Sequence, residues 1–179
     1  MRFAYADPPY PGMSGMYKDH PDYGGEVDHK ALIERLVAEF PDGWALSTSS
    51  KTLGPLVRLC PDDTRILSWV TLNPRFPPGG GLISAWQPCL MKRLRPPKDI
   101  CLDVLVTSYP VGLFNAFLGG KPEEYCFWLF RCLGALPDDE LVDLFPGSGA
   151  VGRAWDKYQR QTTLPIPREK TRTLAFDIP

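Results

Sequence analysis

Two spacings of apolar residues divide the chain into strands and helices. Short apolar runs predict strands at residues 2–6, 43–48, 65–71, 82–91, 100–106 and 141–145. Apolar residues three and four positions apart predict a helix that Asp28 caps and that continues to Phe40. Similar spacings predict further helices at 52–60, 122–133 and 150–158. This alternation predicts an α/β fold, with a mostly parallel sheet and helices on both faces.

Prolines and glycines mark the loops between these elements. Pro8 and Pro9 end the first strand, because proline cannot donate a hydrogen bond to a strand ladder. Residues 13–25 are rich in Gly, Asp, Tyr and Pro and predict a long mobile loop. Residues 73–81 predict another loop by their prolines and glycines.

Length and composition limit the classes of function. A chain of 179 residues with 44% hydrophobic content is long enough for one well-buried domain and too short for two comfortable ones. The formal net charge of -1 gives no global positive field, so any surface that binds nucleic acid must be local. The five cysteines include no C-x-x-C pair, and neither histidine stands at ligand spacing from such a pair. We therefore expect reduced thiols and no metal.

The sequence also predicts where the protein is found. Its first residues lack the charged and then long apolar run of a signal peptide. No stretch approaches the roughly 18 to 20 apolar residues of a membrane span. We expect a soluble, cytoplasmic protein that makes no contact with a membrane.

A glycine turn follows the last predicted strand. Residues 143–149 read Asp-Leu-Phe-Pro-Gly-Ser-Gly. Gly147 and Gly149 allow a tight turn at the carboxyl end of the strand, and their missing side chains let an adenosyl ligand approach the backbone. Turns between strands and helices also use glycine for geometry alone, so this turn by itself leaves both interpretations open.

Asp7-Pro8-Pro9-Tyr10 stands at the end of the first predicted strand. The two prolines restrict the backbone, so the Asp7 carboxylate and the Pro8 carbonyl can both accept hydrogen bonds from one group. The exocyclic NH2 of a base is a matching double donor, and accepting its hydrogens directs the nitrogen lone pair at an incoming methyl. Tyr10 would stack on a base rotated out of the duplex. The alternative is a proline-rich turn whose Asp caps a helix.

Together with Lys121-Pro122, these motifs resemble the amino-methyltransferase family, whose members make N6-methyladenine or N4-methylcytosine in DNA. Residues 7–10 match the family's catalytic D-P-P-Y, and residues 143–149 match its D-x-F-x-G-S-G cofactor loop. Lys121-Pro122 matches the K-P that opens the helix before that loop. The catalytic motif comes first, which is the permuted order of the beta class. The resemblance implies a Rossmann-like class I methyltransferase fold over residues 1–179, without a sizeable separate target-recognition domain.

The resemblance also implies a cofactor and a role for each matching residue. The cofactor would be S-adenosylmethionine (SAM), released as S-adenosylhomocysteine, and the catalytic residues would be Asp7, Pro8, Pro9 and Tyr10. Ser148 and Lys121 would lie near the methionine end of the cofactor. The residues expected to bind SAM are Ala6, Asp7, Lys121, Pro122, Asp143, Phe145, Gly147, Ser148 and Gly149.

Base recognition has no dedicated domain in this sequence, so we expect it to come from small loops, a homodimer or a recognition subunit. The residues expected to contact the substrate are Tyr10, Tyr17, Lys18, Arg75, Lys92 and Arg93. Lys92 and Arg93 belong to a basic stretch whose charges suit phosphate contacts, although a solvated strand edge is the alternative. Asp177 is the nearest candidate to hold the cofactor ribose. The small size would also fit a phage or mobile-element enzyme.

The most specific hypothesis is therefore methyl transfer from SAM to adenine N6 in DNA. Asp7 favours adenine, because cytosine-N4 enzymes more often resemble S-P-P-Y and glutamine methyltransferases resemble N-P-P-Y. RNA adenine-N6 and DNA cytosine-N4 methylation remain alternatives. A catalytically idle relative that binds nucleic acid or a partner subunit is a further alternative of a different class.

Overall fold

The computed structural model describes residues 1–18, 23–72, 81–108 and 120–161, so Arg75 and Asp177 lie outside the described residues. Within them, one sheet has the strand order β5-β3-β4-β2-β1-β6. The strands are β1 (Arg2–Ala6), β2 (Gly43–Ser47), β3 (Arg65–Thr71), β4 (Trp86–Arg93), β5 (Val104–Thr107) and β6 (Glu140–Asp143). The helices are η1 (Ser14–Tyr17), α1 (His29–Glu39), α2 (Leu53–Val57), α4 (Glu123–Cys132) and α5 (Ala150–Gln161).

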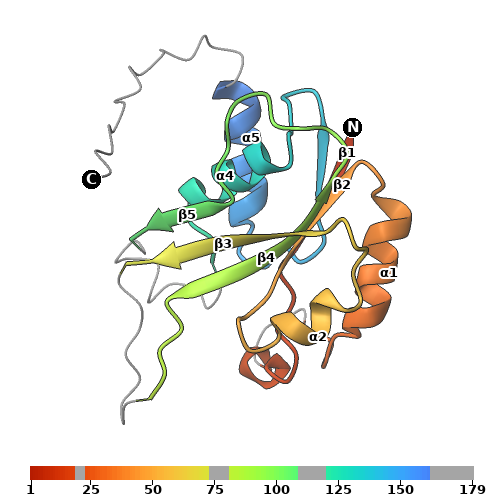
Figure 1. The fold of residues 1–179 in the computed structure, drawn as a ribbon, viewed down its shortest axis with the longest axis vertical. Coiled ribbons are helices and arrows are strands. Elements are labelled where there is room, and N and C mark those ends of the chain that lie inside the picture. Colours follow the sequence, from red (N-terminus) through yellow and green to blue (C-terminus); the bar gives the residue numbers. More distant parts are fainter. Residues whose placement is uncertain (19–22, 73–80, 109–119, 162–179) are drawn as a thin grey trace, which may run out of the picture.

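The sheet is mostly parallel, as the sequence predicts. β1 pairs in parallel with both β2 and β6, and β3 pairs in parallel with β5. β4 alone runs in the opposite direction, antiparallel to its two neighbours β2 and β3. Figure 1 shows α4 and α5 on one face of the sheet and α1 and α2 on the other. The prediction of a Rossmann-like α/β fold with helices on both faces is confirmed.

Alternating side chains of β1 supply both cores. Phe3 and Tyr5 are buried in the cluster that includes α4 and α5, whereas Ala4 and Ala6 are buried in the cluster that includes α1. Successive strand residues point to opposite faces, so five consecutive residues can anchor two helical layers. β1 is therefore held from both sides, and the segment that follows it leaves from a fixed position.

The helices follow from local signals. The carboxylate of Asp28 accepts a hydrogen bond from the backbone N–H of Ala31 at 3.0 Å, as the predicted cap requires. Leu32, Ile33 and Leu36 of α1 are buried against the sheet. α4 begins after Pro122 with two acidic residues and ends with a basic one, which suits the helix dipole.

Several element bounds differ from the sequence prediction, and three of the differences concern segments near the ends of strands or inside a loop. The strand predicted at 82–91 is β4, which begins at Trp86, because Leu82 is fully exposed and pairing with β3 begins at residue 86. The strand predicted at 100–106 is the shorter β5, since Ile100 and Leu102 are exposed. The predicted loop 13–25 contains the short helix η1.

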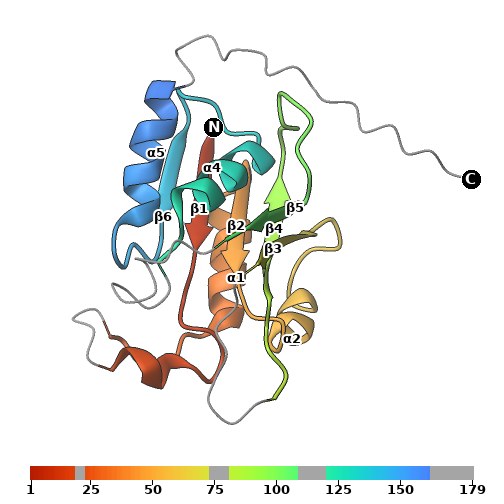
Figure 2. The same cartoon turned by 90° about the vertical axis from the view of Figure 1, so that its left-hand side faces the viewer.

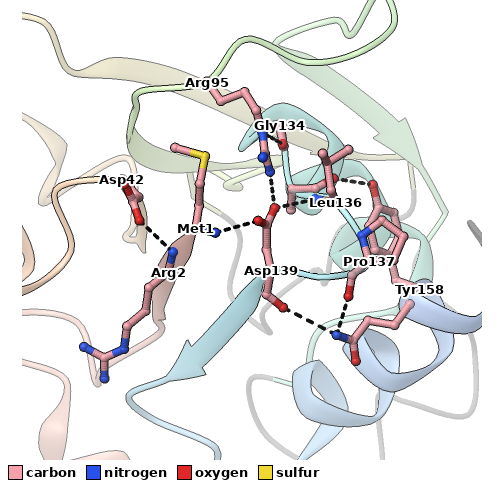
Figure 3. Close-up of polar contacts among 11 residues, drawn as sticks. Met1, Arg2, Asp42, Arg95, Gly134, Leu136, Pro137, Asp139 and Tyr158 are labelled. Carbon is pink, nitrogen blue, oxygen red and sulfur yellow. Dashed lines mark hydrogen bonds and ion pairs between the residues drawn. The ribbon is translucent and has the colours of Figure 1, made fainter.

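The buried carboxylate of Asp139 lies at the amino-terminal end of β1 and β6. Figure 3 shows it between Met1 and Arg95. Its Oδ1 accepts a hydrogen bond from the amino terminus at 2.7 Å. Its Oδ2 accepts one from the backbone N–H of Leu136 at 2.7 Å and another from the Arg95 guanidinium. Burial acts to raise the pKa of Asp139, but these three contacts outweigh it and lower the pKa. The carboxylate ties β1 and the segment before β6 to the loop after β4.

Asp139→Asn is expected to lower the free energy of unfolding by about 3 kcal/mol, because it leaves the Arg95 guanidinium and the amino terminus without their carboxylate. Urea unfolding measures this loss. Since folding lowers the pKa of Asp139, the stabilisation should be complete above pH about 4 and disappear at lower pH. Glu140→Gln is the matched control, because the ion pair of Glu140 with Arg2 is exposed and contributes less than about 1 kcal/mol. Equal losses in both variants would contradict this assignment.

Candidate active site

The pairing of β1 with β6 brings the two predicted motifs together. Tyr5 lies opposite Asp143 in the parallel register, and the backbone N–H of Leu144 donates to the carbonyl of Tyr5 at 2.9 Å. Asp7 follows directly after β1, and the glycine turn follows directly after β6. Figure 2 shows η1, which continues from Asp7-Pro8-Pro9-Tyr10, beyond the carboxyl end of β1. The two motifs, more than a hundred positions apart in sequence, therefore leave one edge of the sheet side by side.

Asp7 forms a buried ion pair with Lys121. The Lys121 ammonium donates to Oδ2 of Asp7 at 2.7 Å, and the exposed fractions of the two side chains are 4% and 17%. The Lys121 nitrogen also lies 5.9 Å from the ring centre of Tyr125 in α4. The sequence prediction placed Lys121 near the methionine end of the cofactor. In the structure, its ammonium contacts the predicted catalytic carboxylate, and its place relative to the cofactor stays a prediction.

Tyr10 lies in the same charged environment. Burial raises the pKa of Tyr10 well above its usual range, the Lys121 ammonium opposes this rise, and the Asp7 charge adds to it. The phenol is therefore neutral at physiological pH. The carbonyl of Tyr10 accepts from Met13 N–H at 2.8 Å, so the chain turns immediately after the motif. Tyr17 of η1 also interacts electrostatically with Tyr10, and Lys18 is the residue directly after η1.

The Glu26 carboxylate contacts the backbone just after Tyr10. Oε1 of Glu26 accepts from the backbone N–H of Gly12 at 2.8 Å. Hydrogen bonds from Gly12 and Ser14 lower the pKa of Glu26. Because Glu26 precedes α1, this contact joins the two ends of the predicted loop 13–25 near the candidate site.

The glycine turn after β6 has the backbone that its sequence predicts. Gly147 and Gly149 have φ angles of 45° and 70°, in the left-handed region that favours glycine. The N–H of Gly149 donates to the Pro146 carbonyl at 2.7 Å, which closes the turn before α5 begins. A Cβ on Gly149 would lie 3.0 Å from the Arg153 guanidinium, so a larger residue would crowd the turn as well as strain it.

Asp143, at the end of β6, has one oxygen to offer a ligand. Its Oδ1 accepts from the backbone N–H of Phe145 at 3.2 Å. Its Oδ2 is buried and has no hydrogen-bond partner among the described residues. Burial and, to a smaller extent, the charge of Asp7 together raise the pKa of Asp143 to about 6, against the lowering effect of the Phe145 N–H. A buried acceptor of this kind beside a glycine turn fits a ligand that brings an ammonium or hydroxyl group.

Three buried hydroxyls beneath the Asp7–Lys121 pair form a network that the sequence did not predict. Ser47 Oγ lies 2.8 Å from the Tyr5 hydroxyl and 3.1 Å from the Tyr125 hydroxyl. These residues come from β2, β1 and α4, so the network links two strands to the helix that follows Lys121. The one feature of the sequence that pointed to this network was Ser47, the polar residue at the end of β2.

The predicted basic stretch lies at the other end of the sheet. Lys92 and Arg93 pair with Trp44 and Gly43 at the beginning of β2, because β4 runs antiparallel to it. The ammonium of Lys92 forms an ion pair with Asp63 at 3.2 Å. The structure therefore does not bring Lys92 and Arg93 together with Asp7. Any contact that they make with nucleic acid would be remote from the candidate site.

The described part of the chain contains no group of three or more His, Cys, Asp or Glu side chains that could hold a metal ion. Among the same residues, no helix combines the length and apolar character needed to span a membrane. All five cysteines are free thiols. Among the described residues, the candidate site offers carboxylates, hydroxyls, the Lys121 ammonium and backbone groups.

Ser47→Ala is expected to lower the free energy of unfolding by about 2 kcal/mol, because it leaves two buried tyrosine hydroxyls without their shared partner. Thermal and urea unfolding measure the loss. Ser84→Ala is the matched control, since Ser84 is exposed and its hydroxyl interacts with the Trp86 carbonyl and the exposed Ser50 hydroxyl. A Ser47→Ala protein as stable as the control would mean that the hydroxyl network contributes no net stability.

Comparisons with known proteins support the fold. No protein-family model matches the chain, and no curated protein matches its sequence. Among solved structures, the M1.HpyAVI–SAM complex matches with a TM-score of 0.64 at 16% identity, over 88% of this chain and 78% of the other. A second M1.HpyAVI structure matches with a TM-score of 0.58 at 15% identity, over 88% and 76% of the two chains. The chain therefore has the Rossmann-like fold of a protein that has been solved with SAM bound.

Proposed function

We propose that this chain is a SAM-dependent methyltransferase whose target is an exocyclic amino group of a nucleic-acid base, with adenine N6 in DNA as the first candidate. The observation that carries the proposal is the meeting of Asp7-Pro8-Pro9-Tyr10 with the glycine turn at one sheet edge. Asp7 and Asp143 are close enough for the charge of one to raise the pKa of the other. A ligand in the glycine turn and a base over Tyr10 would therefore meet at Asp7.

The segment after β6 would hold the cofactor, which supplies a methyl group on a good leaving group, a sulfonium. Gly147 and Gly149 let the adenosyl part approach the backbone, and Ser148 offers a hydroxyl between them. Asp143 Oδ2 would accept a hydrogen bond from an ammonium or hydroxyl of the cofactor. Three further residues are expected to line the pocket: Ala6, Phe145 and Pro122. Each lies next to one of these groups in the sequence or in the strand pairing. The fold shared with the SAM-bound M1.HpyAVI supports this assignment.

Asp7-Pro8-Pro9-Tyr10 would hold the base. Oδ2 of Asp7 is engaged by Lys121, which leaves Oδ1 to accept one hydrogen of the amino group. The Pro8 carbonyl would accept the other, so that the nitrogen lone pair is directed at the methyl. Tyr10, neutral because its pKa is raised, can stack on the base without a charge to desolvate. The residues mainly position the reactants and exclude water.

DNA is proposed over RNA on the resemblance of residues 7–10 to D-P-P-Y, and we expect recognition to come from small loops. Tyr17 and Lys18 of the η1 segment lie just after the motif and are the described residues best placed to reach the strand around a flipped base. Arg75 stays a proposed contact from the sequence alone. A homodimer or a recognition subunit would supply further contacts if these loops are insufficient.

Labelled SAM incubated with unmethylated duplex DNA, single-stranded DNA and RNA is expected to yield N6-methyladenine in DNA, detected by nucleoside mass spectrometry. Asp7→Ala should reduce transfer by at least about a hundredfold while SAM binding is retained, because the variant loses an acceptor of the amino group. Asp63→Ala is the matched control, since Asp63 is exposed at the other end of the sheet.

A folded protein that binds SAM and labels none of the three nucleic acids would contradict the proposed free-standing enzyme. It would then be an accessory module or act on another substrate. N4-methylcytosine or labelled RNA would instead keep methyl transfer and correct its target.

The affinity for SAM is expected to fall by up to about tenfold for each pH unit below pH about 6, because only the ionised form of Asp143 can bind an ammonium strongly. Asp143→Asn should bind SAM more weakly at neutral pH and lose this dependence. Isothermal calorimetry across the pH range measures both effects. Asp138→Asn, an exposed acid just before β6, is the matched control. An unchanged pH profile in Asp143→Asn would remove Asp143 from the cofactor site.

A further inference from the structure

The Asp7–Lys121 ion pair is largely shielded from solvent, with side-chain exposures of 17% for Asp7 and 4% for Lys121. A lysine side chain with 4% exposure is rare unless it is paired, because burial removes the water that stabilises its charge. Lys121 stands directly before Pro122, the N-cap residue of α4. α4 is fixed in turn by a buried face that includes Tyr125 and Leu129. The ammonium therefore reaches Asp7 from the residue directly before the N-cap of a well-packed helix.

The contact is also selective for one oxygen of the carboxylate. The Lys121 ammonium binds Oδ2 of Asp7 at 2.7 Å. A carboxylate on a short side chain can rotate about its last bond, and an ion pair through one oxygen restricts that rotation. Oδ1 is then held in one direction as the acceptor that remains. An acceptor aligned before the substrate arrives avoids the cost of reorganisation during the reaction.

The surroundings of Lys121 hold the ammonium in place from other directions. The ring of Tyr125 lies 5.9 Å from the nitrogen, and the charge of Lys121 acts on the nearby Tyr10 phenol. The Tyr125 hydroxyl is bonded to Ser47, so the ring is itself fixed. Lys121 thus interacts both with the predicted base-stacking residue Tyr10 and with Tyr125 of the buried hydroxyl network.

We propose that Lys121 is a positioning residue for methyl transfer, one that acts through Asp7 and fixes the direction of Oδ1 toward the amino group. This inference rests on the proposed function. It assigns Lys121 a role different from cofactor binding, and the two roles have opposite signatures. A positioning residue changes the rate at saturating substrates, whereas a cofactor ligand changes the affinity for SAM.

The test compares Lys121→Met, Lys121→Arg and the control Lys157→Met in the full chain. Lys157 forms an ion pair of the same length, 2.7 Å, with Glu123, but both partners are about half exposed and Lys157 lies on α5. We expect Lys121→Met to lower kcat by about a hundredfold, with the dissociation constant of SAM within about threefold of the original. Lys121→Arg should recover at least about a tenth of the lost rate, because it restores a cation beside Asp7. Lys157→Met should leave kcat unchanged.

A double-mutant cycle separates positioning from a general structural role. In an Asp7→Asn background, Lys121→Met should change the residual kcat by less than about threefold, since the carboxylate that Lys121 orients is already gone. If Lys121→Met does not fold, Lys121→Gln, alone and combined with Asp7→Asn, replaces it in the same comparison. Thermal unfolding of every variant checks that each is native at the assay temperature.

Two results would overturn the inference. One is a loss of SAM affinity of about tenfold or more in Lys121→Met with kcat unchanged at saturating SAM, which would make Lys121 a cofactor ligand. The other is a loss of kcat on Lys121→Met by the same factor in the original chain and in the Asp7→Asn background. Failure of the proposed function is distinguishable from both, because the unmodified chain would then transfer no methyl group to any nucleic acid.

Discussion

The parallel pairing of β1 with β6 is the constraint on which the candidate site depends. Arg2 to Tyr5 lie opposite Glu140 to Asp143, so both strands end at the same edge of the sheet. Parallel strands place their carboxyl ends together, and in open α/β sheets ligands bind at that edge. At the opposite edge, Asp139 joins the amino terminus to the segment before β6, so the register is secured at the end remote from the site.

The two acids at the site, Asp7 and Asp143, have different electrostatic surroundings. Asp7 has its own cation, Lys121, buried beside it. Asp143 has a buried oxygen without a partner in the described part of the chain, and burial raises its pKa to about 6. The ion pair orients the Asp7 carboxylate as an acceptor. The buried oxygen of Asp143 is available to accept a hydrogen bond from a ligand. This difference suits a cationic cofactor beside Asp143 and a neutral base beside Asp7, and Tyr10 adds no charge of its own.

Features that depend on neighbouring residues could be predicted from the sequence, whereas contacts between distant residues could not. The predicted strands at 2–6 and 65–71 have the observed bounds, and Asp28 caps α1. The reversed direction of β4 has no local signal, because an apolar run reports burial and not orientation. That reversal removes Lys92 from the site. The Asp7–Lys121 ion pair joins residues 114 positions apart, and the motif match predicted both residues without predicting their contact.

A crystal structure of the chain with S-adenosylhomocysteine would show directly whether the two motifs form one site. We expect the adenosyl part against Gly147 and Gly149, the ammonium of the product within hydrogen-bond distance of Asp143 Oδ2, and the sulfur facing Asp7. Asp7 should keep its contact with Lys121. A product bound elsewhere, or bound with its sulfur directed away from Asp7-Pro8-Pro9-Tyr10, would contradict the single site that the pairing of β1 with β6 creates.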